Sequence, residues 1–313
     1  MIFNCLLLTI GLVLLFFSSD WLVENASSIA AAYSIKPIII GLTIVAFGTS
    51  APEFLVSLFA SCSGESGISI GNILGSNVMN IALVLGLSVV IKPINIEVKG
   101  KINNELFFMV AVSIIFWVMC FDGEIGKFDG VFLISLLIVF LIYSYITSKN
   151  DTEDSGQSEE GNNLAKNLLF ITLGIAGLCV GAKLVVDNAV VIANHFNISK
   201  TFIGLSVVAF GTSLPELATS VIAAKKGESD IAIGNVIGSN MFNICMVMGV
   251  VGLISPMYVE EGLSHFEFPF MVIVSISLCI FLNISTNLNR KHGVFFLITF
   301  FIYITGSFYL ATH

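Results

Sequence analysis

Two stretches of the sequence share one pattern: GLTIVAFGTSAPE at residues 41–53 and GLSVVAFGTSLPE at residues 204–216. Each ends in Gly-Thr-Ser-x-Pro-Glu, so Glu53 and Glu216 stand at equivalent places in otherwise apolar sequence. The second copy follows the first at a constant offset of 163 residues, and more than half of the pairs aligned over residues 40–93 are identical. The chain is therefore built from a duplicated unit.

The composition places this duplicated unit in a membrane. Of 313 residues, 56% are hydrophobic and only 11% are charged, whereas a soluble domain carries about 25% charged residues. The cysteines form no Cys-x-x-Cys pair and the four histidines lie far apart, so neither a disulfide scaffold nor a zinc site is expected. A nucleic-acid partner is not expected either, because it would require a basic patch and the net charge is −8.

Ten segments are apolar and long enough to cross about 30 Å of hydrocarbon. They cover residues 3–33, 36–61, 68–91, 101–121, 128–147, 164–195, 200–224, 230–254, 264–284 and 292–311. The stretch between the fifth and sixth segments contains five acids and no apolar residue. It lacks the EF-hand spacing, which favours a solvated connection over a calcium loop. We therefore expect a five-helix repeat at residues 1–147, an acidic cytoplasmic linker at 148–163 and a second repeat at 164–313.

The basic residues orient the spans by the positive-inside rule. With the N-terminus outside, ten of the 13 lysines and arginines fall on the cytoplasmic side: Lys36, Lys92, Lys99, Lys101, Lys149, Lys166, Lys225, Lys226, Arg290 and Lys291. Both termini are therefore expected on the outer side. The first apolar segment lacks a basic start and belongs to the repeat, which favours a membrane span over a cleaved signal peptide.

The number of spans in each unit determines how the two units lie. Five is odd, so the second unit enters the membrane upside down. Inverted repeats of this kind are typical of secondary transporters, whose substrate sites lie near the midplane between the repeats. The predicted fold is an all-α integral membrane protein with ten transmembrane helices in two inverted five-helix repeats. Asp20 and Lys183 take equivalent positions in the first and sixth spans, where they would pair across the pseudo-two-fold axis or line a solvated vestibule.

Each Gly-Thr-Ser-x-Pro-Glu motif places a glutamate mid-way along an apolar span, which costs roughly 2.5–3.5 kcal/mol. The motif also supplies oxygen atoms around that glutamate. The proline cannot donate a hydrogen bond to the carbonyl four residues earlier, and the glycine there lets the backbone unwind. The two hydroxyl residues precede the glutamate by four and three positions, so on a helix they share its face. An oxygen-only cage suits hard cations such as calcium and sodium. The two sets are Gly48, Thr49, Ser50, Pro52 and Glu53, and Gly211, Thr212, Ser213, Pro215 and Glu216.

A second motif follows in the next span of each unit, as GNILGSNVMN at residues 71–80 and GNVIGSNMFN at residues 234–243. Polar residues recur in it every four positions and form one face of a helix, while glycine pairs let helix backbones approach closely. Packing between helices is the alternative to ion binding here, above all for the glycines. The polar residues are Asn72, Ser76, Asn80, Asn235, Ser239 and Asn243, and the glycines are Gly71, Gly75, Gly234 and Gly238.

With both motif pairs, the chain resembles the calcium/cation antiporter superfamily in its sodium/calcium exchanger branch, and in particular the short inner-membrane calcium/sodium antiporters of bacteria. The resemblance covers nearly the whole chain. It implies that the second, third, seventh and eighth helices surround the ions and that the first and sixth slide past them. The implied ligands are Thr49, Ser50, Glu53, Ser76, Asn80, Thr212, Ser213, Glu216, Ser239 and Asn243, with the carbonyls of Ala46 and Ala209.

One position departs from the family pattern. Some members carry aspartate where Asn243 stands, so this site would hold two acids rather than three, and the number of sodium ions and any potassium dependence stay open. Two ionised glutamates would be neutralised by one calcium or two sodium ions. An empty, doubly charged site is costly in a low dielectric, so an unloaded carrier should resist crossing. The same cost predicts that protons compete for the site at acid pH.

The predicted function is secondary antiport of sodium against calcium, with no cofactor besides the transported ions. A calcium/proton exchanger on the same fold is the alternative, and a passive cation channel is less expected because the acidic site is closed. An intramembrane enzyme is least expected, since no His-Glu-x-x-His motif occurs. The lipid bilayer is the only partner implied; no obligate protein partner is inferred, and a monomer is consistent with the sequence.

Overall fold

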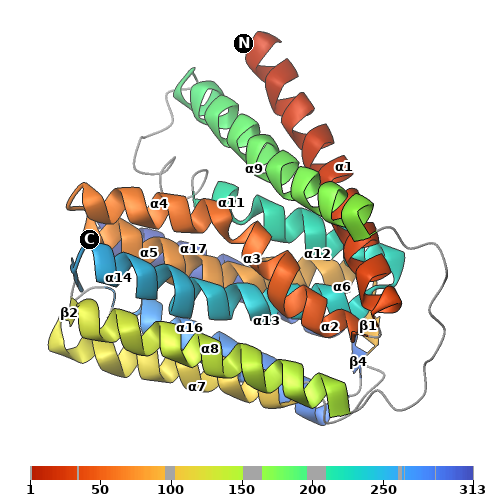
Figure 1. The fold of residues 1–313 in the computed structure, drawn as a ribbon. Helices are drawn as coiled ribbons and strands as arrows, with labels where there is room; N and C mark the ends of the chain where they lie inside the picture. The colour runs from red at the N-terminus through yellow and green to blue at the C-terminus, as the bar shows by residue number, and fades with distance from the viewer. Residues whose placement is uncertain are drawn as a thin grey trace.

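The computed structural model describes residues 2–33, 35–95, 103–150, 164–195, 209–259, 263, 265–285 and 287–312, and most of them are helical (Figure 1). The first sequence copy contains α1 (Ile2–Ala32), α2 (Pro37–Ile40), η1 (Gly41–Val45), α3 (Ala46–Thr49), α4 (Ala51–Cys62), α5 (Ser66–Met79), η2 (Asn80–Leu85), α6 (Gly86–Ile91), β1 (Ile94–Asn95), α7 (Asn103–Met119), η3 (Cys120–Asp122), β2 (Glu124–Ile125) and α8 (Lys127–Asn150). The second contains α9 (Leu164–His195), α11 (Ala209–Thr212), α12 (Leu214–Lys226), α13 (Ser229–Met241), η5 (Phe242–Met248), α14 (Gly249–Ile254), β3 (Met257–Tyr258), α16 (Glu267–Ile284), β4 (Asn287–Leu288) and α17 (Arg290–Thr312).

The predicted spans appear as long apolar helices. Within the described residues, eight helices are long and apolar enough to cross a membrane, and a bent pair, Pro37–Thr49 with Ala51–Cys62, forms a ninth span with a 44° bend. The remaining predicted span, 200–224, is described only from residue 209, as α11 and α12. The described part of the chain is thus consistent with ten spans.

Two continuous helical runs form the centre of the molecule: α5–η2–α6 and α13–η5–α14. In the most apolar 18 residues of these two runs, 83% and 78% of the residues are buried, against 17–39% in the other six long helices. Both runs carry the Gly-Asn-x-x-Gly-Ser-Asn motif, whose small residues let neighbouring helices approach. The two runs that carry this motif therefore lie innermost, and the outer helices expose large apolar side chains such as Phe128 and Ile284.

The helices that carry the glutamates break at equivalent places. The first breaks at Ser50 (φ −78°, ψ 5°) and the second at Ser213 (φ −87°, ψ 7°). In each case the next helix has its proline in the first turn, a position where the missing N–H costs nothing. Glu53 and Glu216 consequently lie in the first turns of α4 and α12.

Two short antiparallel ribbons connect the sequence copies. Strand β1 pairs with β4 through Ile94 and Leu288, and β2 pairs with β3 through Ile125 and Met257. These strands were not predicted, because two-residue strands leave no periodic pattern and each pairs with a segment far away in the sequence.

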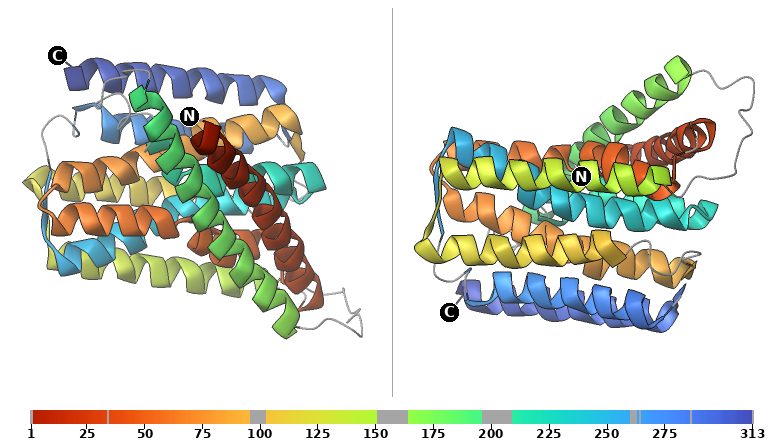
Figure 2. Two further views of the ribbon diagram at one scale, coloured as in Figure 1. Left: turned by 90° about the horizontal axis from the view of Figure 1, so that it is seen from above. Right: turned by 60° about the horizontal axis from the view of Figure 1, so that its bottom comes forward.

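Helices α1 and α9 pack along each other and cross the remaining bundle obliquely (Figure 2, left). Glycines permit this contact: a Cβ atom at Gly11 would lie 2.9 Å from the carbonyl oxygen of Gly181, and one at Gly181 would lie 3.1 Å from that of Gly11. The pair corresponds to the first and sixth predicted spans.

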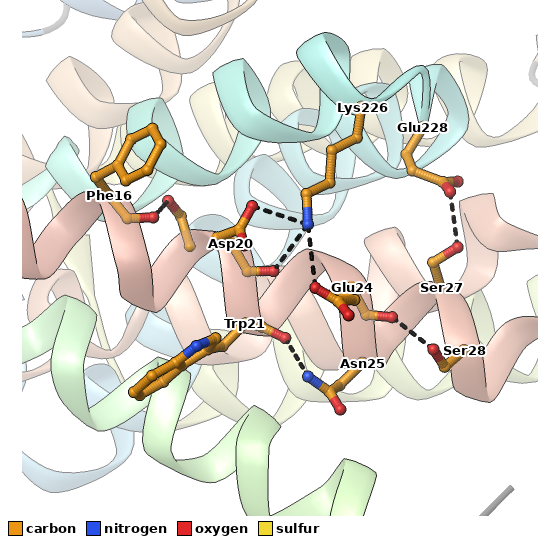
Figure 3. Close-up of polar contacts among 10 residues, drawn as sticks. Phe16, Asp20, Trp21, Glu24, Asn25, Ser27, Ser28, Lys226 and Glu228 are labelled. Atoms are coloured by element: carbon orange, nitrogen blue, oxygen red, sulfur yellow. Dashed lines mark hydrogen bonds and ion pairs between the residues drawn. The ribbon is translucent and has the colours of Figure 1, made fainter.

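One end of α1 is fixed to the hairpin between α12 and α13 by charged side chains (Figure 3). Lys226 Nζ lies 2.8 Å from Asp20 Oδ1 and 3.4 Å from Glu24 Oε2. Ser27 Oγ donates to Glu228 Oε1 at 2.8 Å. Of the two alternatives for Asp20 and Lys183, the pair does not form among the described residues: Lys183 lies 3.9 Å from Asp187 on its own helix, and the side chains of Lys183 and Asp187 are mostly exposed.

We expect Lys226→Gln to loosen this end of α1 by about 1 kcal/mol or less, since partly exposed ion pairs contribute little to stability. Hydrogen exchange of the purified protein should become faster in residues 20–32. The matched control is Lys183→Gln, which removes a mostly exposed pair within α9 and should leave exchange in both helices unchanged. Unchanged exchange in Lys226→Gln would contradict the assignment of Lys226 as the anchor of α1.

Candidate functional site

The two motif glutamates are the centre of the site. Both are fully buried, and they come from α4 of the first sequence copy and α12 of the second. Their place in the first turn of each helix is favourable for a carboxylate, because helix N-termini carry partial positive charge. A helix N-terminus does not by itself neutralise a buried charge, so further groups must contribute.

The hydroxyl groups reach across to the glutamate of the other copy. Ser50 Oγ lies 3.4 Å from Glu216 Oε1, and Ser213 Oγ lies 3.3 Å from Glu53 Oε1. The three-residue spacing predicts that each serine shares a helix face with the glutamate of its own motif. The backbone leaves helical geometry at both serines, and each hydroxyl lies beside the glutamate of the opposite repeat.

The next helices bind the same motifs through their first asparagines. Asn72 Nδ2 donates to the backbone oxygen of Glu53 at 3.3 Å, and its Oδ1 accepts from Thr212 Oγ1 at 3.5 Å. Asn235 repeats the arrangement: its Nδ2 donates to the backbone oxygen of Glu216 at 3.4 Å, and its Oδ1 accepts from Thr49 Oγ1 at 3.1 Å. Each of these asparagines thus joins a glutamate of its own copy to a threonine of the other.

The second-motif serines also face the site. Ser76 Oγ lies 3.4 Å from Glu53 Oε1 and from Ser213 Oγ. Ser239 Oγ lies 3.4 Å from Thr49 Oγ1. The described helices therefore bring together side-chain oxygens from α3–α4, α5, α11–α12 and α13.

Among the described residues, four buried oxygen atoms of the motif glutamates and asparagines have no hydrogen-bond partner: Glu53 Oε2, Glu216 Oε2, Asn80 Oδ1 and Asn243 Oδ1. Buried acceptors are nearly always paired in folded proteins. Unpaired carboxylate and amide oxygens are ligands of hard cations. Asn80 begins the π-helical segment η2 and Asn243 lies in η5, and such π segments are frequent at functional sites.

Of the two backbone carbonyls expected as ligands, that of Ala46 already accepts hydrogen bonds. The oxygen of Ala46 accepts the N–H of Ser50 at 3.0 Å and the hydroxyl of Thr49 at 3.3 Å. Its use as an ion ligand would require one of these bonds to open. Ala209 begins α11, and the residues before it lie outside the described part of the chain.

The motif glycines allow α13 to lie against the backbone of the bent helix. A Cβ atom at Gly234 would lie 2.5 Å from the oxygen of Ile38, and one at Gly238 would lie 2.5 Å from the oxygen of Leu42. Among the described residues, an added Cβ at Gly71 would meet nothing within 4 Å, and one at Gly75 would lie 3.5 Å from Tyr303 Oη. At Gly48 and Gly211, an added Cβ would meet the side chains of α9 residues Ile175 and Val186.

The structure adds two functional candidates that the motif spacing does not predict, Asn77 and Asn240. They fall outside the four-residue spacing of the polar face, yet both are 1% exposed and hydrogen-bonded to Asn243 and Asn80 across the repeats. The available signal was the presence of an asparagine at equivalent positions of two apolar spans.

Ser69 lies in the sequence GISIG, which has the spacing of a hydrolase nucleophile motif. The serine is buried within α5, where its hydroxyl donates to the Ser57 carbonyl at 2.9 Å and Ser57 Oγ donates back to the Ser69 carbonyl at 3.2 Å. These reciprocal bonds hold α4 against α5, so the motif serves helix packing.

Similar proteins identify the family of the chain. The family model described as "Sodium/calcium exchanger protein" matches residues 3–146 and 166–309. Inner membrane protein YrbG of Escherichia coli is 39% identical over 86% of each chain. Sodium/calcium exchanger MaX1 of Methanosarcina acetivorans is 32% identical over 98% of this chain and 99% of that protein. A solved structure of the sodium-calcium exchanger NCX_Mj superposes with a TM-score of 0.86 at 36% identity, covering 97% of this chain and 98% of that one. The chain belongs to the sodium/calcium exchanger family.

Proposed function

We propose that the protein exchanges sodium for calcium across the membrane by alternating access at a site around Glu53 and Glu216. The observation that carries this proposal is the set of four buried, unpaired oxygen atoms on these glutamates and on Asn80 and Asn243. Family membership supports the choice of ions. The proposed ligands are Thr49, Ser50, Glu53, Ser76, Asn80, Thr212, Ser213, Glu216, Ser239 and Asn243, with the Ala46 and Ala209 carbonyls.

The balance of charge in the site would couple sodium movement to calcium movement. One calcium ion or two sodium ions would neutralise the two glutamates, so either load lets the site move through a low dielectric at reduced cost. The serine hydroxyls would keep donating to the carboxylates while their lone pairs face the cation. An empty site would leave two uncompensated charges buried. Exchange is therefore obligatory in this scheme.

Both repeats contribute to every part of the cage, which suits alternating access. Ser50 and Ser213 each lie beside the glutamate of the opposite repeat, so the ligands of both repeats form one set that either facing of the carrier would use. Helices α1 and α9 pack along each other and lie obliquely across the bundle. We assign this pair the sliding motion.

Proteoliposomes loaded with sodium test the proposal. Calcium uptake should follow an outward sodium gradient and should vanish when choline replaces sodium inside. A pH gradient that drives the same uptake without sodium would favour a calcium/proton exchanger, and a potassium gradient tests potassium dependence. Uptake that proceeds without any counter-ion would indicate a channel and would contradict the proposal.

Protons are expected to compete with calcium, because they neutralise the same carboxylates. As the pH falls, more of the sites are protonated and fewer bind calcium. The half-saturating calcium concentration should therefore rise from mildly alkaline to mildly acid buffer, while the maximal rate at saturating calcium changes little. A half-saturating concentration that is the same at both pH values would speak against competition at the glutamates.

We infer that the protein resides in a bacterial inner membrane with both termini outside, as two inverted repeats at 1–147 and 164–313 joined by the cytoplasmic linker 148–163. The similarity to a protein named inner membrane protein supports the location, and the distribution of lysine and arginine supports the orientation. A reporter that is active only in the cytoplasm should be inactive when fused after His313 and active when inserted into the linker. The reverse pattern would refute the orientation.

A further inference from the structure

Two buried asparagines outside the proposed ligand set lie between the central helices. Asn77 is on α5 and Asn240 is on α13, at equivalent positions of the two sequence copies. Each is 1% exposed. A primary amide at such a position must find partners for both its oxygen and its NH₂ group, because an unpaired buried polar group costs about 1–3 kcal/mol.

The oxygens of these two residues accept hydrogen bonds from two proposed ion ligands. Asn243 Nδ2 donates to Asn77 Oδ1 at 3.1 Å, and Asn80 Nδ2 donates to Asn240 Oδ1 at 3.0 Å. Each bond crosses from one repeat to the other. In both bonds the donor is the ligand residue and the acceptor is the neighbouring asparagine.

Neighbouring groups on α7 and α16 hold the acceptors in this orientation. Asn77 Nδ2 lies 3.6 Å from Met271 Sδ, and Asn240 Nδ2 lies 3.7 Å from Met109 Sδ and 3.3 Å from the Asn77 carbonyl oxygen. The NH₂ groups of Asn77 and Asn240 are thereby occupied. Their oxygens remain directed at the ligand residues.

An amide carries its oxygen and its NH₂ group on opposite sides, so fixing one end aims the other. With their NH₂ groups bound to Asn240 and Asn77, Asn80 and Asn243 keep Oδ1 atoms that have no partner. Those are two of the four unpaired oxygens of the proposed cation site. Without the acceptors, either ligand amide could rotate by half a turn and present its NH₂ group, the positive end of its dipole, to the cation.

We propose that Asn77 and Asn240 are positioning residues that aim the amide oxygens of Asn243 and Asn80 at the transported cation. This inference rests on the proposed function, because it takes Asn80 and Asn243 as ligands. It also accounts for an amide rather than a carboxylate at position 243: a carboxylate has no proton to donate to Asn77 Oδ1, and it would place two acceptors against each other. The acceptor at Asn77 therefore favours a neutral ligand at 243 and a cage with two acids.

A double-mutant cycle on the full-length protein tests this role. Asn77→Leu removes the acceptor at similar volume, and Asn243→Ala removes the ligand that it orients. In proteoliposomes, Asn77→Leu should raise the half-saturating calcium concentration about 3- to 10-fold, the effect of one lost hydrogen bond. In the Asn243→Ala background, Asn77→Leu should add no further change, because there is no amide left to orient.

The outcomes separate this inference from the proposed function. If the effects of the two substitutions on the half-saturating calcium concentration multiply, Asn77 does not act through Asn243 and the inference is wrong. It is also wrong if Asn77→Leu lowers the midpoint of thermal unfolding without calcium but leaves the half-saturating calcium concentration unchanged, because Asn77 is then merely structural. If Asn243→Ala itself leaves calcium exchange unchanged, the ligand assignment fails together with the inference. The cycle of Asn240→Leu with Asn80→Ala repeats the test at the other repeat and replaces the first if Asn77→Leu does not fold.

Discussion

Glutamine in place of Glu53 or Glu216 is expected to lower calcium exchange by about 100-fold or more, since breaking a buried charge pairing is strongly unfavourable. Glutamine preserves the size of the side chain and one acceptor oxygen, so Ser213 can still donate to residue 53 and Ser50 to residue 216. What is lost is one negative charge. A calcium ion would then keep one uncompensated positive charge in a fully buried site.

Sodium-dependent calcium uptake into proteoliposomes measures this effect. Glu105→Gln is a matched control, because Glu105 is also buried, at 4% exposure, and has an unpaired Oε2 atom, but it lies on α7 outside the cage. That variant should retain the wild-type half-saturating calcium concentration. If Glu53→Gln or Glu216→Gln exchanges calcium normally, the cation site has been assigned to the wrong residues.

Alanine in place of Gly238 is expected to destabilise the protein by about 2–3 kcal/mol, the upper part of the range for overpacking a close contact. Its Cβ atom would lie 2.5 Å from the oxygen of Leu42 and 2.7 Å from the Cβ atom of Ala46. Neither is the flexible end of a side chain, so α13 would have to move away from η1 and α3. That movement would carry Ser239 and Asn243 with it, and calcium affinity should fall as well.

Thermal unfolding of the purified protein with and without calcium measures both effects. The midpoint should drop in the absence of calcium, and the additional rise caused by calcium should shrink, because ligand stabilisation follows affinity. Gly126→Ala is the control, since its Cβ atom would meet nothing closer than 3.7 Å. A Gly238→Ala protein with an unchanged midpoint would show that α13 does not depend on this close approach.

Much of the fold could be predicted because it depends on local patterns. The run of apolar residues predicts each span, and the repeated Gly-Thr-Ser-x-Pro-Glu motif fixes where Glu53 and Glu216 stand in their helices. The proline and glycine beside each glutamate also mark the region of the break, which the structure places at Ser50 and Ser213. These are properties of a single segment and its neighbours within about one helical turn.

The partners of the side chains could not be predicted in the same way. A four-residue spacing tells which residues share a face of one helix, but it does not tell which helix lies opposite that face. Ser50 therefore looked like a neighbour of Glu53, whereas its hydroxyl lies beside Glu216. Asp20 pairs with Lys226 rather than with Lys183 for the same reason.

The amino-acid pattern alone thus predicts a duplicated membrane protein with ten spans and one motif glutamate in each half. The cross-copy hydrogen bonds of Ser50, Ser213, Asn77 and Asn240 become visible only in the folded molecule. Helix formation follows from interactions within a few residues, so one segment is enough to predict it. The choice of hydrogen-bond partner depends on how distant helices pack, and no pattern along one segment records that.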